Sequence, residues 1–192
     1  MTLRCHEMSQ THRLDRLRAA LLAFRAADAV ESGHRHKMLA LTAVEGDPFT
    51  RSHLVPGHFT ASAFLLSPDE KAVLLILHRK LRRWLQPGGH IERHDADILA
   101  AARRELLEEA SVAKADPIGL EPFDVDVHQI PALGSEPSHH HFDVRVLLRA
   151  RSWAIRAGAE VEDARWVPLN AIEEVGTDES VLRATRKLVA RG

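Results

Sequence analysis

The residues with the clearest chemical potential form one short segment, which combines an arginine with three glutamates: Arg104, Glu105, Glu108 and Glu109. On a helix the glutamates stand at positions i, i+3 and i+4, so they project from one side. Like charges at this spacing repel one another, and a single arginine cannot neutralise three carboxylates. Hard oxygen ligands at this density suit Mg²⁺ or Mn²⁺, which also bind phosphate oxygens. The segment therefore predicts a divalent metal site and a diphosphate substrate. The alternative is a solvated acidic helix face.

A glycine pair precedes this segment, in the order Gly88, Gly89, His90, Ile91 and Glu92. Because glycine has no Cβ, the backbone at the pair can approach an ion or phosphate groups closely. The pair and the carboxylates together favour a binding site over a merely solvated surface.

These two segments resemble the signature of the Nudix (MutT-like) hydrolases. That signature is a glycine, a spacer with an acidic residue, Arg-Glu, an apolar residue, any residue, Glu-Glu, any residue, Gly and an apolar residue. Gly89 and residues 104–112 occupy the corresponding positions. Residues 85–89 and residues 164–169 also look like the family. The resemblance extends from about residue 58 to the C-terminus and indicates no particular subfamily.

Three departures from the signature matter. The spacer between Gly89 and Arg104 is one residue longer than usual, and Asp95 stands in it where the family has glutamate. Ser111 replaces the closing glycine, which is unfavourable if the helix ends in a left-handed residue. None of these changes removes a metal ligand, so the resemblance still implies an active enzyme.

The resemblance implies hydrolysis of a nucleoside diphosphate linked to another moiety, with water as the nucleophile. In the family pattern Glu105, Glu108 and Glu109 hold the divalent cation, Mg²⁺ or Mn²⁺, and Arg104 orients the glutamates. A backbone carbonyl of the glycine turn, assigned to Gly89, completes the ligands. This agrees with the chemistry inferred from the residues, because a bound metal offsets phosphate charge and lowers the pKa of its water. The sequence does not indicate the group attached to the diphosphate.

The resemblance also implies a general base, which in this family often lies on a loop before the last strand. Glu160 and Glu162 precede the expected strand around Trp166, and we expect Glu160 to be the catalytic residue. A solvent-exposed acidic loop is the alternative.

Histidines form a second group of candidates. His139, His141 and Asp143 alternate at the start of an expected strand, so their side chains share one face. Such a strip could bind a transition metal, contact the substrate or line a solvated edge. A basic run that begins at Arg79 could meet phosphates near the glycine pair. The predicted substrate contacts are His90, Glu92, His139, His141 and Arg79.

Two other functions are compatible with the sequence. A Nudix-fold module could bind a nucleotide as a sensor without cleaving it, although the intact arginine and glutamates argue against this. A different metal hydrolase could be centred on His139, His141 and Asp143.

Periodicity and turn residues predict the elements that position these side chains. Residues 11–44 are expected to be helical with a break at Ser32-Gly33. The carboxylate helix is expected from Ala96 to Ala110, with Asp95 as its N-cap. Strands are expected at 60–66, 72–78, 124–130, 142–149 and 164–167, and a final helix at 178–190. The first two strands are expected to form a hairpin, because a turn at residues 67–70 joins them. This mixture predicts a sheet packed by helices. With the family resemblance, we expect an α/β/α sandwich with a mixed sheet, in a Nudix domain of residues 58–192 that follows an N-terminal helical extension of residues 1–57.

Composition limits the setting and the partners. The chain has 192 residues, a net charge of −1 and one cysteine, Cys5. The balanced charge argues against a nucleic acid polymer as partner, and one cysteine excludes an internal disulfide. No apolar run reaches transmembrane length and no signal core is evident at the N-terminus, so we expect a cytoplasmic protein that acts on a small molecule. The N-terminal helices could serve a homodimer contact.

Overall fold

The computed structural model describes residues 2–119 and 122–190, with side chains from residue 12 onward. The chain forms two compact units. The first unit comprises the described parts of residues 1–61, 90–101 and 121–144, and the second those of 62–89, 102–120 and 145–192. In the described part of the chain, no helix has both the length and the apolar composition needed to cross a membrane.

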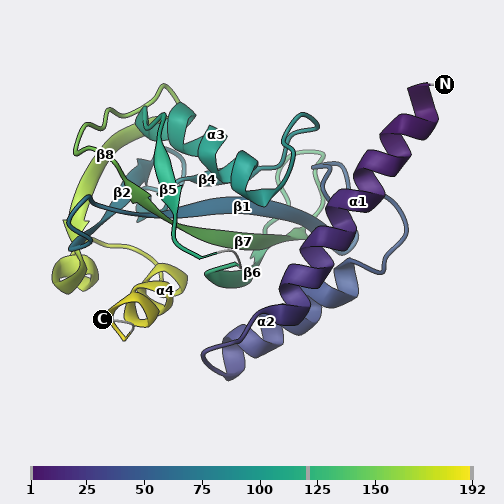
Figure 1. The fold of residues 1–192 in the computed structure, drawn as a ribbon, viewed down its shortest axis with the longest axis horizontal. Helices are drawn as coiled ribbons and strands as arrows, with labels where there is room; N and C mark the ends of the chain where they lie inside the picture. Colours follow the sequence, from purple (N-terminus) through teal and green to yellow (C-terminus); the bar gives the residue numbers. More distant parts are fainter. Residues whose placement is uncertain (1, 120–121, 191–192) are drawn as a thin grey trace. The chain divides into compact units, whose positions relative to one another are not determined.

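Two helices begin the first unit, α1 (Thr2–Ala23) and α2 (Ala29–Leu41), and they lie side by side (Figure 1). Leu21 of α1 and Met38 of α2 are fully buried. The expected break at Ser32-Gly33 is wrong, because both residues lie inside α2. The chain turns earlier, where the Asp28 side chain accepts a hydrogen bond from the Glu31 N–H at 2.7 Å and caps α2.

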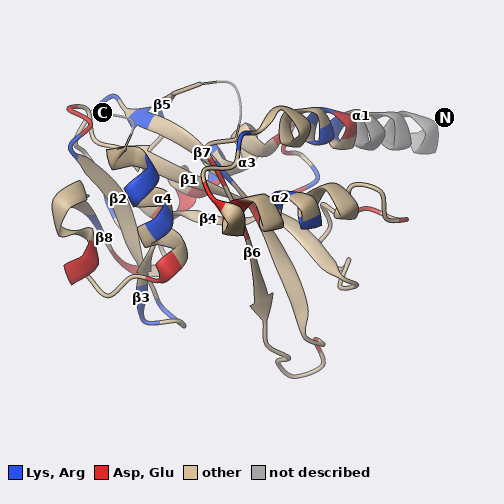
Figure 2. Cartoon of the chain, turned by 90° about the horizontal axis from the view of Figure 1, so that it is seen from below, with Lys and Arg blue, Asp and Glu red and all other residues tan. Residues whose placement is uncertain are grey.

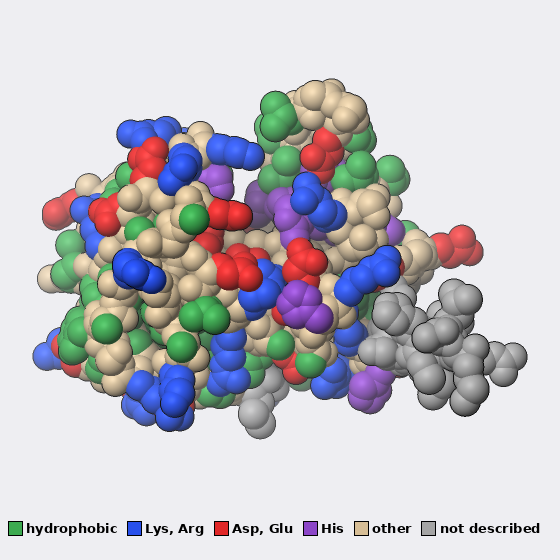
Figure 3. Space-filling view, turned by 90° about the horizontal axis from the view of Figure 1, so that it is seen from above, with side chains coloured by type: hydrophobic (Ala, Val, Ile, Leu, Met, Phe, Trp, Pro, Cys, Tyr) green, Lys and Arg blue, Asp and Glu red, His purple; other side chains and the backbone are tan. Residues whose placement is uncertain are grey.

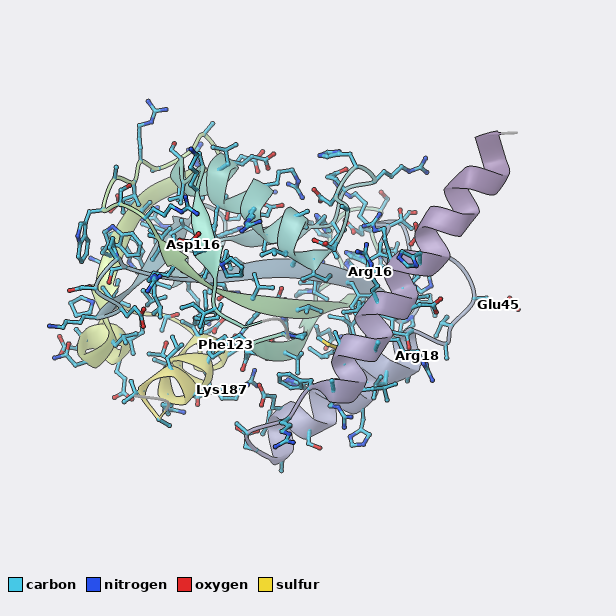
Figure 4. The ribbon with its side chains drawn as sticks, viewed as in Figure 1. Arg16, Arg18, Glu45, Asp116, Phe123 and Lys187 are labelled. Atoms are coloured by element: carbon cyan, nitrogen blue, oxygen red, sulfur yellow. The ribbon has the colours of Figure 1, made fainter. Side chains whose placement is uncertain are left out.

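Polar side chains of α1 tie this helix to the rest of the first unit. Arg16 and Arg18 project from it (Figure 4). Arg16 donates to the Ala96 carbonyl at 2.8 Å, and Arg18 donates to the Thr42 hydroxyl at 2.9 Å. The helix is therefore held by specific hydrogen bonds as well as by its apolar side chains.

Backbone hydrogen bonds join eight strands within the described residues. The strands are β1 (Gly57–Leu66), β2 (Ala72–His78), β3 (Arg83–Leu85), β4 (Gly88–His90), β5 (Ala115–Pro117), β6 (Asp124–Ile130), β7 (His139–Ala150) and β8 (Val161–Pro168). β1 and β7 run from one unit into the other. The strands are interspersed with helices, and the α/β/α class with a mixed sheet and an N-terminal helical extension, expected from the sequence, is confirmed.

The central strand of the second unit is β2. It pairs antiparallel with β8 from Ala72↔Pro168 to His78↔Val161, and with β3 from Ile76↔Leu85 to His78↔Arg83. The predicted hairpin is also present, since β1 pairs antiparallel with β2 at Leu66↔Val73. Residues 72–76 are all buried, which explains their continuous apolar run.

The C-terminal elements of the second unit are a 3-10 helix, η1 (Leu169–Glu174), and α4 (Glu179–Val189). Asp178 caps α4 by accepting from the Val181 N–H at 3.0 Å. The acidic first turn and basic last turn of α4 suit the helix dipole. Figure 2 shows both signs of charge on this helix, as expected for a chain with little net charge.

Helix α3 (Ile98–Ala110) carries the carboxylates. It begins two residues later than expected, and the predicted N-cap, Asp95, is wrong. Asp97 takes that role, because its Oδ1 accepts from the Ala100 N–H at 2.8 Å. Asp95 is buried instead and accepts from the Glu92 N–H at 2.8 Å. It therefore braces the spacer loop before the helix.

Candidate metal site on helix α3

Two of the three glutamates lie on the buried side of α3. Ala102, Leu106 and Ala110 are fully buried there, and Glu105 and Glu109 share this side with only 8% of each residue exposed. The Glu108 side chain is 55% exposed. The alternative of a solvated acidic face therefore fits Glu108 and does not fit the other two carboxylates.

The glycine pair lies directly against these carboxylates. The Gly88 N–H donates to Glu109 Oε2 at 3.0 Å. A Cβ at Gly89 would stand 2.6 Å from Glu105 Oε1, and one at Gly88 would stand 2.8 Å from the Ser62 Cα. Side chains at these two positions would occupy space that the carboxylate and β1 already fill. The glycine backbone therefore packs directly against the Glu105 carboxylate and β1, and the absence of a Cβ makes this close approach possible.

Arg104 bridges two of the glutamates. Its Nη1 donates to Glu105 Oε1 at 2.8 Å and to Glu108 Oε2 at 2.9 Å. A charge-assisted bond from a half-buried guanidinium restrains both carboxylates. The Glu109 carboxylate accepts a hydrogen bond from the backbone N–H of Gly88 instead.

The electrostatics of this group are unfavourable without a cation. The pKa of Glu109 is raised to about 7, mainly by burial and in smaller part by the nearby carboxylates of Glu105, Glu160 and Glu108, while the hydrogen bond from Gly88 opposes the shift. Such crowding is relieved by a positive ion among the oxygens. The donor set is made only of oxygen atoms, so the residues fit Mg²⁺ or Mn²⁺.

The loop after β7 is fastened to the end of α3. The Arg156 N–H donates to the Ala110 carbonyl at 3.1 Å and the Gly158 N–H donates to the Glu109 carbonyl at 2.9 Å. A Cβ at Gly158 would lie 1.8 Å from the Glu108 carbonyl oxygen. Only glycine fits this approach, which brings the following residues, including Glu160, to the carboxylate group.

The two candidate bases differ in their surroundings. Glu160 is exposed, and its charge contributes to the raised pKa of Glu109. Glu162 is engaged in an ion pair with Arg82. Arg79, predicted as a substrate contact, donates to the carbonyls of Ala159 at 3.0 Å and Val161 at 3.3 Å, and so holds the backbone on both sides of Glu160.

Ser111 ends α3 in the left-handed conformation, with φ of 58°. Its N–H donates to the Leu107 carbonyl, and the N–H of Val112 donates to the Leu106 carbonyl, both at 3.1 Å. The left-handed geometry is the one in which a serine is less favourable than the family's glycine. The departure seen in the sequence therefore concerns the stability of the helix end.

The remaining predicted substrate residues lie in the first unit. His90 and Glu92 line a pocket of about 150 Å³ together with Arg13, Arg51 and Arg93. Arg13 and Arg51 were not predicted, because nothing in their local sequence links them to residues 90–93. The three arginines outnumber the two carboxylates of the pocket, Asp47 and Glu92, so the lining has a net positive charge that favours an anion.

The structure assembles the histidines differently from the predicted strip. Among the described residues, His141 forms a potential metal-binding group with His58 and His90. Asp143 is buried and its Oδ1 accepts from the Thr60 hydroxyl at 3.1 Å. Histidine side chains also gather on one face of the surface (Figure 3). The sequence alone could not group the three histidines, since 31 or more residues separate each from the next.

Residues 56–188 match a family model described as the NUDIX domain. This match spans more than half of the chain, so the protein belongs to the NUDIX family, as the resemblance predicted. No curated protein matches the chain.

Solved structures of the family share the fold. The dihydroneopterin triphosphate pyrophosphohydrolase of E. coli is 16% identical, with a TM-score of 0.53 over 70% of this chain and 96% of that one. RenU, a Nudix hydrolase from M. smegmatis, is 17% identical, with a TM-score of 0.52 over 70% of this chain and 84% of that one. The NUDIX domain of NrtR from Shewanella oneidensis, in complex with ADP ribose, is 22% identical, with a TM-score of 0.50 over 69% and 86%.

Proposed function

We propose that this protein hydrolyses the diphosphate bond of a nucleotide-derived compound in a reaction that depends on Mg²⁺ or Mn²⁺. The observation that carries the proposal is the packing of Glu105 and Glu109 against the Gly88-Gly89 turn, with both carboxylates largely buried. These buried carboxylates do not stabilise the fold by themselves, because burying like charges is unfavourable without a compensating ion. A role in binding a cation accounts for them better.

The ion would be held by Glu105, Glu108, Glu109 and the carbonyl of Gly89. When bound, it would neutralise phosphate charge and lower the pKa of a coordinated water. Arg104 keeps Glu105 and Glu108 in place through its two hydrogen bonds. Gly88 does the same for Glu109 through its N–H. The chain thus positions each carboxylate before any ligand arrives.

Glu160 is the proposed general base, which takes the proton of the attacking water. Two contacts support this role: the loop is bonded to the end of α3 at Gly158, and Arg79 holds the carbonyls of Ala159 and Val161. Glu162 is less suited because Arg82 already pairs with it. Arg79 then acts as a positioning residue, in addition to the predicted contact with phosphate.

The proposed substrate class rests on family membership and on the acidic ligand set. One relative in fold cleaves a pterin triphosphate by its name, and another is a domain bound to ADP ribose. A nucleoside diphosphate derivative is therefore the first class to test. The predicted substrate contacts remain predictions; they are His90, Glu92, His139 and His141. The domain boundary at residue 57, the cytoplasmic location and the homodimer also remain predictions.

The deciding experiment is a screen of the purified protein against nucleotide sugars, dinucleotides, nucleoside triphosphates and non-nucleotide diphosphates. Each compound is tested with Mg²⁺ and with Mn²⁺, and released phosphate or monophosphate is measured. We expect hydrolysis that stops on chelation and falls by roughly 100-fold or more in Glu105→Gln. Glu174→Gln, an exposed glutamate on η1, is the matched control and should retain parent activity.

Two outcomes would contradict the proposal. Hydrolysis by Glu105→Gln at the parent rate would show that the carboxylates on α3 are not the metal site. Tight binding of a nucleotide diphosphate with no turnover in either metal would favour the sensor module.

A further inference from the structure

A second group of potential metal ligands lies in the first unit, and its side chains come from three different strands. His58 belongs to β1, His90 to β4 and His141 to β7. One ligand atom from each lies within 4.8 Å of the other two. The ring centroids are 4.8 Å apart for His58 and His141, 5.1 Å for His58 and His90, and 5.2 Å for His90 and His141. Three imidazoles this close share one small volume.

The hydrogen bonds of His58 define which nitrogen can bind a metal. Its Nδ1 lies 3.2 Å from the His53 carbonyl oxygen. A carbonyl only accepts, so Nδ1 carries the proton and Nε2 carries the lone pair. Metal-binding histidines commonly donate their other N–H to a backbone carbonyl in this way. The hydrogen bond to the His53 carbonyl therefore already orients the His58 ring as a metal ligand is oriented.

The lone pair of His58 accepts no hydrogen bond from the described residues. His58 is fully buried, and its Nε2 has no hydrogen-bond partner in the part of the chain that the structure describes. A buried polar atom left without a hydrogen bond is destabilising, because it has lost its contact with water and gained none in return. A ligand bound between this atom and the two neighbouring imidazoles would satisfy it.

His139 repeats the same pattern next to this group. Its Nδ1 lies 3.0 Å from the Pro137 carbonyl, and its buried Nε2 has no hydrogen-bond partner among the described residues, with Glu136 Oε1 3.8 Å away. Its ring lies 5.2 Å from that of His58 and 5.3 Å from that of His141. Two orphaned imidazole nitrogens at one place favour a ligand over an accident of packing.

Burial lowers the pKa of all three imidazoles, which favours their neutral form. Burial lowers the pKa of His58 to about 4, and burial together with the neighbouring histidines lowers the pKa of His141 to about 2. No proton then competes with a metal for the lone pairs. A protonated cluster would repel a cation, and a neutral cluster does not.

We propose that His58, His90 and His141 bind one divalent transition-metal ion, with Zn²⁺ as the best fit, through a ligand set separate from the carboxylates of α3. Imidazole nitrogen suits Zn²⁺, whereas Mg²⁺ prefers oxygen. Zn–N bonds of about 2.0–2.1 Å place tetrahedral ligand atoms roughly 3.3 Å apart, so the rings close together when the ion enters. Three protein ligands leave a fourth position for water or another small ligand.

The test uses full-length protein that carries both Glu105→Gln and Glu109→Gln, so that binding on α3 is weakened and the result does not depend on hydrolysis. Metal is removed with a chelator, and Co²⁺ is added at neutral pH as the probe. Visible absorption of Co²⁺ reports nitrogen ligands and four-coordinate geometry. We expect one Co²⁺ per chain with such bands, and we expect Zn²⁺ to displace it.

His90→Asn and His141→Asn are then compared in the same background, because both residues are only half-buried. Each should weaken Co²⁺ binding by roughly 100-fold or more. His140→Asn is the matched control, since His140 neighbours His141 on β7 and alternation along a strand places it on the opposite face. It should bind Co²⁺ as the parent does.

Melting temperatures without metal show whether each variant is folded, and the Zn²⁺-induced rise in melting temperature gives a second readout of binding. A folded variant that loses this rise supports the site. The proposal is overturned if the protein with Glu105→Gln and Glu109→Gln alone shows no absorption bands of nitrogen-bound Co²⁺. It is also overturned if both histidine variants bind Co²⁺ as tightly as His140→Asn does.

Discussion

The carboxylates of α3 and the histidines of β1, β4 and β7 are two groups of titratable side chains that burial shifts in opposite directions. Burial raises the pKa of Glu109 and lowers the pKa values of His58 and His141. In both groups the neutral form is favoured when no ion is present. The carboxylates would gain from a cation through charge, and the imidazoles through their lone pairs. Because the donor atoms differ, we expect different metals at the two groups. The oxygen atoms of the carboxylates suit a hard ion, and the nitrogen atoms of the imidazoles suit a borderline ion.

The largest expected effect separates the two groups by activity. Glu109→Gln should lower Mg²⁺-dependent turnover by roughly 100-fold or more, because the amide cannot supply the negative charge of the carboxylate. The same variant should bind Co²⁺ at the histidines as the parent does. Steady-state kinetics and Co²⁺ absorption check the two halves. A parallel loss of both would show that the groups are not independent.

The next effect concerns the stability of the metal-free protein. The folded pKa of Glu109 is raised from 4.5 to about 7, so the folded state holds this proton more tightly than the unfolded state. Its contribution to stability is therefore present below pH 4.5 and is lost as pH rises through about 7. Glu109→Gln should raise the free energy of unfolding at about pH 8 by roughly 1–3 kcal/mol.

Chemical denaturation of parent and variant at several pH values measures this difference. It should shrink toward zero as pH falls to 4.5, the ordinary pKa of the group. A variant that is less stable than the parent at about pH 8 would show that the buried carboxylate is not strained without metal.

A smaller effect is expected from Gly89→Ala. The new Cβ would stand 2.6 Å from Glu105 Oε1, which lies at the end of a flexible side chain. The carboxylate should therefore move while the fold stays intact. We expect roughly a 10-fold rise in the Mg²⁺ concentration needed for half-maximal activity, with little change in melting temperature.

Gly33→Ala is the control for Gly89→Ala, because a Cβ at Gly33 in α2 would meet no heavy atom within 4 Å. It should leave the Mg²⁺ requirement unchanged. Equal behaviour of the two variants would remove Gly89 from the metal site.

The smallest effect is expected from Ser111→Gly at the end of α3. With φ of 58°, Ser111 occupies a conformation that disfavours a residue with a Cβ. Glycine should raise the free energy of unfolding by about 1 kcal/mol and leave turnover unchanged. Denaturation and kinetic assays on the purified variant measure both quantities. Altered turnover would mean that the helix end contributes to the site beyond its stability.

Local sequence was enough to predict the carboxylate helix and the hairpin of β1 and β2. Helical spacing places Glu105, Glu108 and Glu109 on one side whatever the helix packs against. Apolar runs separated by a turn predict a hairpin for the same local reason. Family membership followed from the same stretch, because its motif is contiguous in the chain.

Competition between neighbouring polar residues was harder to predict. Asp95 and Asp97 are both good N-caps by type, and the structure uses Asp97 because Asp95 is occupied by the Glu92 N–H. Likewise Asp28 sets the start of α2, and Gly33 is accommodated within the helix. In each case the deciding interaction is a hydrogen bond that composition does not reveal.

The sequence by itself determined the chemical types: a crowded set of oxygen donors at helical spacing, a glycine turn before it and many histidines. Tertiary structure decided how these are used. It buried Glu105 and Glu109 and left Glu108 exposed, and it attached the loop before Glu160 to α3 through Gly158. It also brought His58, His90 and His141 together. The physical reason is that spacing along a helix is local, whereas burial and the meeting of separate strands depend on the packing of the whole chain.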